Sequence, residues 1–194
     1  VSSVEGYLDT GLVISGNVNE AEKSVVTGSV KVYELSMTDS NSKEFLSSET
    51  VTCTLKEIDY HNSSYHIDSL SILSPYLFFE LDSISNNLFW IFKVEEEDST
   101  ETSPSASEDN LFYAINHLSL QKGVVDYTDN LTGQPFNYHL SEIQIETDSI
   151  FSDAEWVEIN SQMLLNDRGT LVARIGYDPV DYLDGVLDIS VEKF

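Results

Sequence analysis

Apolar and polar residues alternate with a period of two along most of this chain, which predicts β-strands. The alternation is regular over residues 187–191. It changes phase within residues 30–37 and again within 138–145, and the second change, at Ser141-Glu142, indicates a β-bulge. Short polar turn sequences separate the strand segments. The pattern therefore predicts a mainly β fold with nine or ten long antiparallel strands.

One segment has helical features, and aromatic residues cluster around it. Asp82 or Ser83 is suited to cap a short helix within residues 83–92, to which Leu88 and the following residues supply apolar side chains. The aromatic residues of this region are Tyr76, Phe78, Phe79, Phe89, Trp90 and Phe92. They either form a core patch at one end of the sheet or line part of an apolar groove.

An acidic, serine-rich stretch at residues 93–110 is expected to be a mobile loop, because it is highly charged and almost free of large apolar side chains. The loop divides a single domain, residues 1–194, into halves 1–92 and 111–194. Residues 32–37 are similar to residues 115–120, which raises the hypothesis that the two halves are related copies.

The chain is strongly acidic, with 34 Asp and Glu residues against 9 Lys and Arg and a formal charge of -25. This charge argues against binding to nucleic acid or to anionic lipid headgroups. It favours solubility, with divalent cations or a cationic partner as the alternative. No apolar run approaches the ~18 residues that a membrane-spanning helix needs. Because the chain begins at Val1, we expect it to be a segment of a longer protein that carries any anchor elsewhere.

Motifs for catalysis are missing from the sequence, which contains no G-x-S-x-G, P-loop or dinucleotide-binding fingerprint. His61 and His66 flank a turn but provide only two of the three or four ligands that zinc requires. The three carboxylates within residues 178–184 do not have the spacing of a calcium loop. We therefore expect a non-enzymatic protein without metal or cofactor, and a hydrolase with a carboxylate pair remains an alternative.

Three motifs follow one another in the middle of the chain. Residues 67–81 read IDSLSILSPYLFFEL, in which Pro75 separates two strand segments. Asn86-Asn87-Leu88 comes next, and after the acidic stretch residues 118–129 read LSLQKGVVDYTD. This order resembles the AsmA-like family of bacterial envelope proteins, including its branch known only as a domain of unknown function.

The resemblance implies a curved, half-pipe-like sheet of long antiparallel strands with an apolar inner face. It also implies a periplasmic location and a role in outer-membrane biogenesis, as a scaffold or in lipid transport, with acyl chains and other envelope proteins as partners. If the half-pipe forms, seven residues should project to its concave side: Val32, Leu55, Ile72, Leu120, Leu140, Ile145 and Ile175. The alternative from composition is a secreted β-sandwich that binds glycan or protein.

Overall fold

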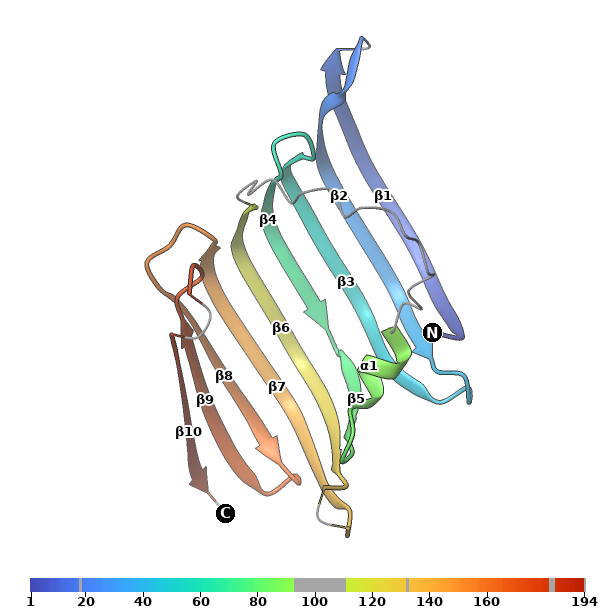
Figure 1. Ribbon diagram of the computed structural model, residues 1–194, viewed down its shortest axis with the longest axis vertical. Coiled ribbons are helices and arrows are strands. Elements are labelled where there is room, and N and C mark those ends of the chain that lie inside the picture. The colour runs from blue at the N-terminus through green and yellow to red at the C-terminus, as the bar shows by residue number, and fades with distance from the viewer. Residues whose placement is uncertain (18, 93–110, 132, 182–183, 194) are drawn as a thin grey trace.

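The computed structural model describes residues 1–17, 19–92, 111–131, 133–181 and 184–193, and it forms one curved sheet (Figure 1). The elements are β1 (Ser3–Asn17), β2 (Glu20–Thr38), β3 (Glu44–Asp59), β4 (Ser64–Leu73), β5 (Tyr76–Leu81), α1 (Asn87–Phe92), β6 (Phe112–Asp129), β7 (Phe136–Phe151), β8 (Val157–Leu165), β9 (Gly169–Tyr177) and β10 (Gly185–Lys193). The prediction of a mainly β fold with one short helix is confirmed.

The strand order is β1-β2-β3-β4-β6-β7-β8-β9-β10, and β5 pairs with β3 and β6. Most neighbours are antiparallel, but β4 and β5 both run parallel to β6. They follow one another beside β6 and are interrupted at Ser74-Pro75, as the proline predicts. A parallel pair requires a long crossover, which here comprises α1 and residues 93–110. The predicted mobile loop lies outside the described residues.

The helix begins one turn later than the sequence suggests, because Asn86 provides its cap. The Asn86 Oδ1 atom accepts a hydrogen bond from the backbone N–H of Phe89 at 2.9 Å. The Asp82 carboxylate, predicted as a cap, instead accepts the backbone N–H groups of Ile84 and Ser85. It closes the preceding turn.

The Asn87 side chain attaches the helix to β5. Its Nδ2 donates to the carbonyl oxygen of Phe78 at 2.9 Å, and its Oδ1 accepts from the backbone N–H of Glu80 at 2.8 Å. These are hydrogen bonds that a neighbouring strand would otherwise make. The amide therefore satisfies β5 where that strand is no longer paired with β3.

Few apolar side chains of the described residues are fully buried. The buried set consists of Phe45, Ala114, Ile143, Ile150, Val157 and Ala173. The accessible surface of 13311 Å² exceeds the value of about 9,300 Å² expected for a compact protein of 21.8 kDa. The difference is about 4,000 Å² for the whole chain. It is expected for a sheet that, among the described residues, has no second layer covering it. Among the described helices, none is long and apolar enough to cross a membrane.

Candidate functional site

Two rows of mainly apolar residues cross the sheet in register on one side, which we call the groove face. Residues paired directly across neighbouring strands present their side chains to the same face. The first row contains Leu8, Val32, Val51, Ile72, Leu120, Ile145, Ser161, Ala173 and Ile189. The second row contains Val4, Met37, Leu46, Leu77, Val125, Leu140 and Leu165.

A line of backbone irregularities separates the two rows. Positive φ angles occur at Gly6 (146°) on β1, Glu34 (51°) on β2, Ser74 (51°) between β4 and β5, Lys122 (56°) on β6 and Glu142 (50°) on β7. On β2, β6 and β7 the rows are five residues apart, an odd spacing that would place them on opposite faces of a regular strand. On these three strands the irregularities correct the phase, so that both rows share the groove face. They include the bulge predicted at Ser141-Glu142, where the pairing with β8 shifts register.

β-Bulges bend the strand that contains them and increase its twist. A line of such positions across neighbouring strands creates a crease in the sheet. The crease contains Gly123, at which an added Cβ would lie 2.9 Å from Leu120 Cδ2 and 3.1 Å from Ile143 Cβ. A side chain at this position would displace the Leu120 side chain and press on Ile143, so the crease is closely packed around Gly123.

An apolar groove of about 510 Å³ lies along this crease. Its lining includes Leu35 and Pro75 beside the crease, together with members of both rows. None of its lining residues carries a charge, although the chain as a whole has a formal charge of -25. The volume and the apolar lining are typical of sites for small apolar ligands.

Five of the seven predicted groove residues line the groove: Ile72, Leu120, Leu140, Ile145 and Ile175. Val32 lies in the first row, but on β2 and outside the lining. Leu55 lies farther along β3, opposite Ile67, and also outside the lining. Leu55 is separated from the groove because the strands are longer than the groove.

Sequence reasoning missed several residues of the groove, among them Leu77, Val125, Ile143 and Ser161. Leu77 and Val125 share the groove face with the first row only because of the irregularities at Ser74 and Lys122. The phase change within 138–145 is the signal from which Ile143 could have been assigned to the same face.

The predicted aromatic cluster is divided between the two faces of the sheet. Phe79 stacks on Tyr127, with ring centroids 5.7 Å apart, and Tyr127 stacks on Tyr138 at 5.8 Å. Tyr76 and Phe78 alternate with Phe79 along β5, and Lys43 Nζ lies 3.2 Å from the centroid of the Phe78 ring. Of the helix residues, Phe89 is exposed, and the side chains of Trp90 and Phe92 lie outside the described part.

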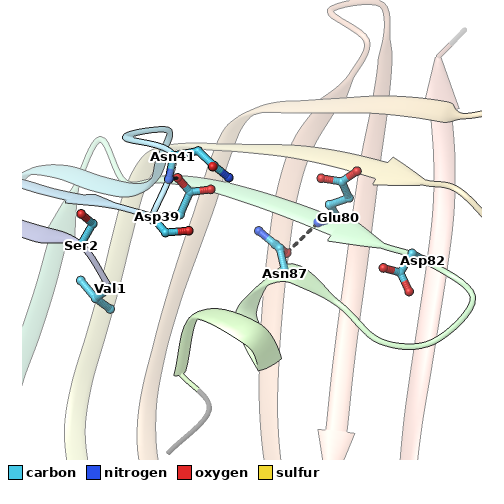
Figure 2. A pocket seen from close by; sticks show the side chains of 8 residues that line it. Val1, Ser2, Asp39, Asn41, Glu80, Asp82 and Asn87 are labelled. Carbon is cyan, nitrogen blue, oxygen red and sulfur yellow. Dashed lines mark hydrogen bonds between the residues drawn. The ribbon is translucent and has the colours of Figure 1, made fainter.

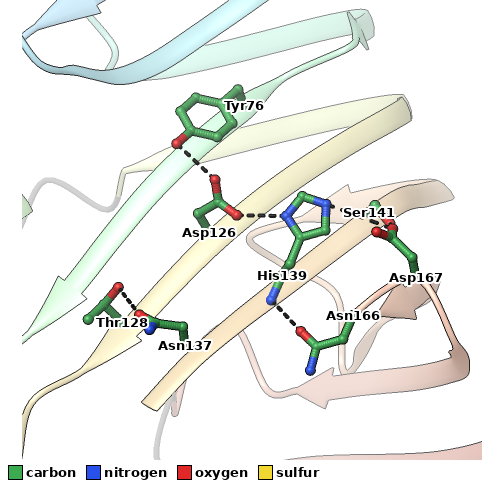
Figure 3. Close-up of polar contacts among 8 residues, drawn as sticks. All are labelled: Tyr76, Asp126, Thr128, Asn137, His139, Ser141, Asn166 and Asp167. Carbon is green, nitrogen blue, oxygen red and sulfur yellow. Dashed lines mark hydrogen bonds and ion pairs between the residues drawn. The ribbon is translucent and has the colours of Figure 1, made fainter. Parts of the chain in front are cut away.

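The opposite side of the sheet, the polar face, carries a hydrogen-bonded network (Figure 3). Tyr76 Oη donates to Asp126 Oδ2 at 3.0 Å, and His139 Nδ1 lies 2.7 Å from Asp126 Oδ1. On its other side, His139 Nε2 is 3.9 Å from Asp167 Oδ1, which accepts a hydrogen bond from Ser141 Oγ at 2.7 Å. The network joins β5, β6, β7 and the turn after β8 (Figure 3).

This network braces the sheet, because its hydrogen bonds join side chains from neighbouring strands. Burial, followed by the hydrogen bond and the charge of Asp126, raises the pKa of Tyr76 to about 12. A tyrosine with a raised pKa holds its proton and serves as a donor. The Ser141 hydroxyl donates to the Asp167 carboxylate, and this hydrogen bond joins β7 to the turn after β8.

A second pocket lies beside α1, and its acidic lining consists of Asp39 and Asp82 from turns and Glu80 from β5 (Figure 2). Asp39 Oδ1 accepts the backbone N–H groups of Asn41 and Lys43. Glu80 Oε1 accepts a hydrogen bond from Asn130 Nδ2 at 2.9 Å. Asp39 and Asp82 therefore accept backbone N–H groups within turns, and Glu80 links β5 to Asn130, so each carboxylate has a hydrogen-bond partner.

Three of the four histidines contact separate partners. His66 Nε2 lies 3.2 Å from Asn116 Oδ1, and His117 Nδ1 lies 2.7 Å from Asp148 Oδ1. His117 does not pair with His139, which faces Asp126 instead. Among the described residues, no group of three or more His, Cys, Asp or Glu side chains is arranged to hold a metal ion.

In comparisons with known proteins, no family model and no curated protein sequence matches this chain.

Proposed function

We propose that this chain is a non-enzymatic lipid-binding module whose apolar groove holds or conducts acyl chains. The observation that carries this proposal is the groove face itself. Two apolar rows continue across the sheet, and no second layer among the described residues covers them. An apolar face of this extent, exposed on a soluble monomer, is typical of an interaction site.

The composition of the groove supports an acyl ligand over a polar one. Acyl chains require continuous apolar surface and few polar contacts, and no charged residue lines the groove. The first row also reaches the exposed side chains of Leu8 on β1 and Ile189 on β10. An apolar path that continues to both edges of the sheet is suited to passing a chain onward as well as to holding it.

We further propose that the module acts in the bacterial periplasm, in outer-membrane biogenesis, as a scaffold or in lipid transport with other envelope proteins. The AsmA-like resemblance supports this part. Its motifs coincide with consecutive elements: a strand before Pro75, a strand after it, the helix at Asn87 and the strand that contains Gly123. Such an assignment rests on analogy with a family and is separate from the chemistry of the groove.

The alternative, a β-sandwich that binds glycan or protein, requires two packed sheets with a closed core. The described strands all belong to a single sheet. This arrangement therefore favours the acyl-chain proposal.

Leu140→Asp tests the proposed function. Leu140 is half-buried at the groove, so the new carboxylate can reach solvent while it places a charge in the path of an acyl chain. We expect a folded protein, with binding of a pyrene-labelled lysophosphatidylcholine weakened by at least about tenfold. Fluorescence titration measures the binding, and circular dichroism measures the fold.

The matched control is Gln144→Asp, which places the same charge on the same strand but on the exposed polar face. It should bind the probe as the wild type does. A folded Leu140→Asp variant with unchanged probe binding would contradict the proposal, as would a wild type that does not bind the probe.

A further inference from the structure

Ser161 differs from the other polar residues of the groove. It belongs to the first row, on β8, between Ile145 of β7 and Ala173 of β9. Its exposed fraction is 8%, and it lines the apolar groove together with its strand neighbours Ile159 and Met163. Its Oγ atom is the one buried side-chain oxygen or nitrogen of the described residues that has no hydrogen-bond partner.

A buried hydroxyl without a partner is unfavourable, because it loses its hydrogen bonds to water and gains none. Ser48, at the β3 side of the same groove, shows the usual solution. It is equally buried, and its Oγ is within hydrogen-bonding distance of the carbonyl oxygens of Leu73 (2.8 Å) and Thr50 (3.3 Å). The two serines are buried to a similar extent, but only the Ser48 hydroxyl has a hydrogen-bond partner. This difference singles out Ser161 as a donor suited to a ligand.

We propose that the Ser161 hydroxyl is the polar anchor of the groove and donates a hydrogen bond to the ester carbonyl oxygen of an acyl lipid. The inference rests on the proposed function and adds the part of the lipid that the groove recognises. A serine hydroxyl provides one donor, which matches one carbonyl acceptor.

The surroundings of Ser161 select a neutral acceptor. None of the residues that line the groove is cationic, so the carboxylate of a free fatty acid would be buried without a counter-charge. An ester carbonyl avoids that cost, since it is polar but uncharged. The corresponding ether lipid lacks the carbonyl oxygen and leaves the Ser161 donor unsatisfied.

The test compares two lipids that differ at this group alone: 1-palmitoyl lysophosphatidylcholine, an ester, and its 1-hexadecyl ether counterpart. Each displaces the pyrene-labelled probe from the wild type, Ser161→Ala and Ser48→Ala. We expect the wild type to bind the ester about 3- to 10-fold more tightly than the ether, as one hydrogen bond provides. Ser161→Ala should lose this preference by binding the ester more weakly, and Ser48→Ala should keep it.

Thermal unfolding of the same variants gives an independent measurement. Removal of the unsatisfied Ser161 hydroxyl should leave the Tm unchanged or raise it, whereas Ser48→Ala should lower the Tm because the hydrogen bond to the nearer carbonyl oxygen, that of Leu73, is lost. A Ser161→Ala variant that retains the ester preference overturns the anchor, and so does a wild type that binds both lipids equally. A wild type that binds neither lipid overturns the proposed function and the anchor with it.

Discussion

On β6 and β7, neighbouring residues meet different surroundings on the two faces of the sheet. Val125 and Leu140 line the groove, where the apolar surface is open. One residue away, Asp126 and His139 are joined to each other and to Tyr76 on the polar face. The polar side chains find their partners within the sheet, and the apolar ones lie along a surface that the sheet alone does not cover. Substitutions on the polar face should therefore change stability alone, and substitutions on the groove face should also change ligand binding.

The largest effect should come from a charge at the floor of the groove. Ile143 is buried beside Gly123, so Ile143→Asp places an unpaired carboxylate where it cannot reach solvent. We expect a loss of unfolding free energy above about 3 kcal/mol, measured by urea denaturation. The adjacent Gln144→Asp, on the polar face, should remain within about 0.5 kcal/mol of the wild type. Similar losses for the two variants would remove the distinction between the faces.

A smaller effect is expected when the centre of the polar network is removed. Asp126→Ala leaves Tyr76 Oη and His139 Nδ1 without their shared partner. Because the Asp126 and His139 side chains are about 40% exposed, water replaces part of the loss, and we expect about 1–2 kcal/mol of destabilisation. Lipid binding by the folded variant should be unchanged. Weakened binding at equal folded fraction would show that the two faces are coupled.

The raised pKa of Tyr76 predicts a pH dependence in alkaline solution. Its pKa is about 12 in the folded protein and near 10 in the unfolded chain, so the unfolded state releases the proton first as the pH rises. The stabilisation that protonated Tyr76 contributes is complete below about pH 10 and declines between about pH 10 and 12. The stability difference between wild type and Tyr76→Phe should therefore shrink across this range in parallel urea titrations. A constant difference would show that the tyrosine is not held in its protonated form.

The smallest effect concerns His117, which does not line the groove. The hydrogen bond that His117 donates to the Asp148 carboxylate is the main cause that raises the pKa of this histidine above 6.5. A group whose pKa is raised in the folded state stabilises the protein below its unfolded-state pKa. This stabilisation is lost as the pH rises through its folded-state pKa. An NMR titration should give a higher pKa for His117 in the wild type than in Asp148→Asn. Equal values in the two proteins would exclude the pair in solution.

The period-two alternation was sufficient to predict the class of fold, because each strand exposes successive side chains to opposite faces. Pro75 marked the interruption between β4 and β5, and the phase change near Ser141 marked a bulge. The helix was expected in the correct segment, although its cap is Asn86 and not Asp82. These features depend on local backbone chemistry, which a sequence expresses directly.

Contacts between distant segments were decided by the tertiary structure. The parallel junction of β4 with β6 joins residues about fifty positions apart, and alternation within a strand says nothing about the direction of its neighbour. The alignment of Glu34, Ser74, Lys122 and Glu142 into one crease likewise depends on register. Register is set by pairing across the whole sheet, and so the sequence alone determined which residues alternate, while the sheet determined which of them meet in the groove around Ser161.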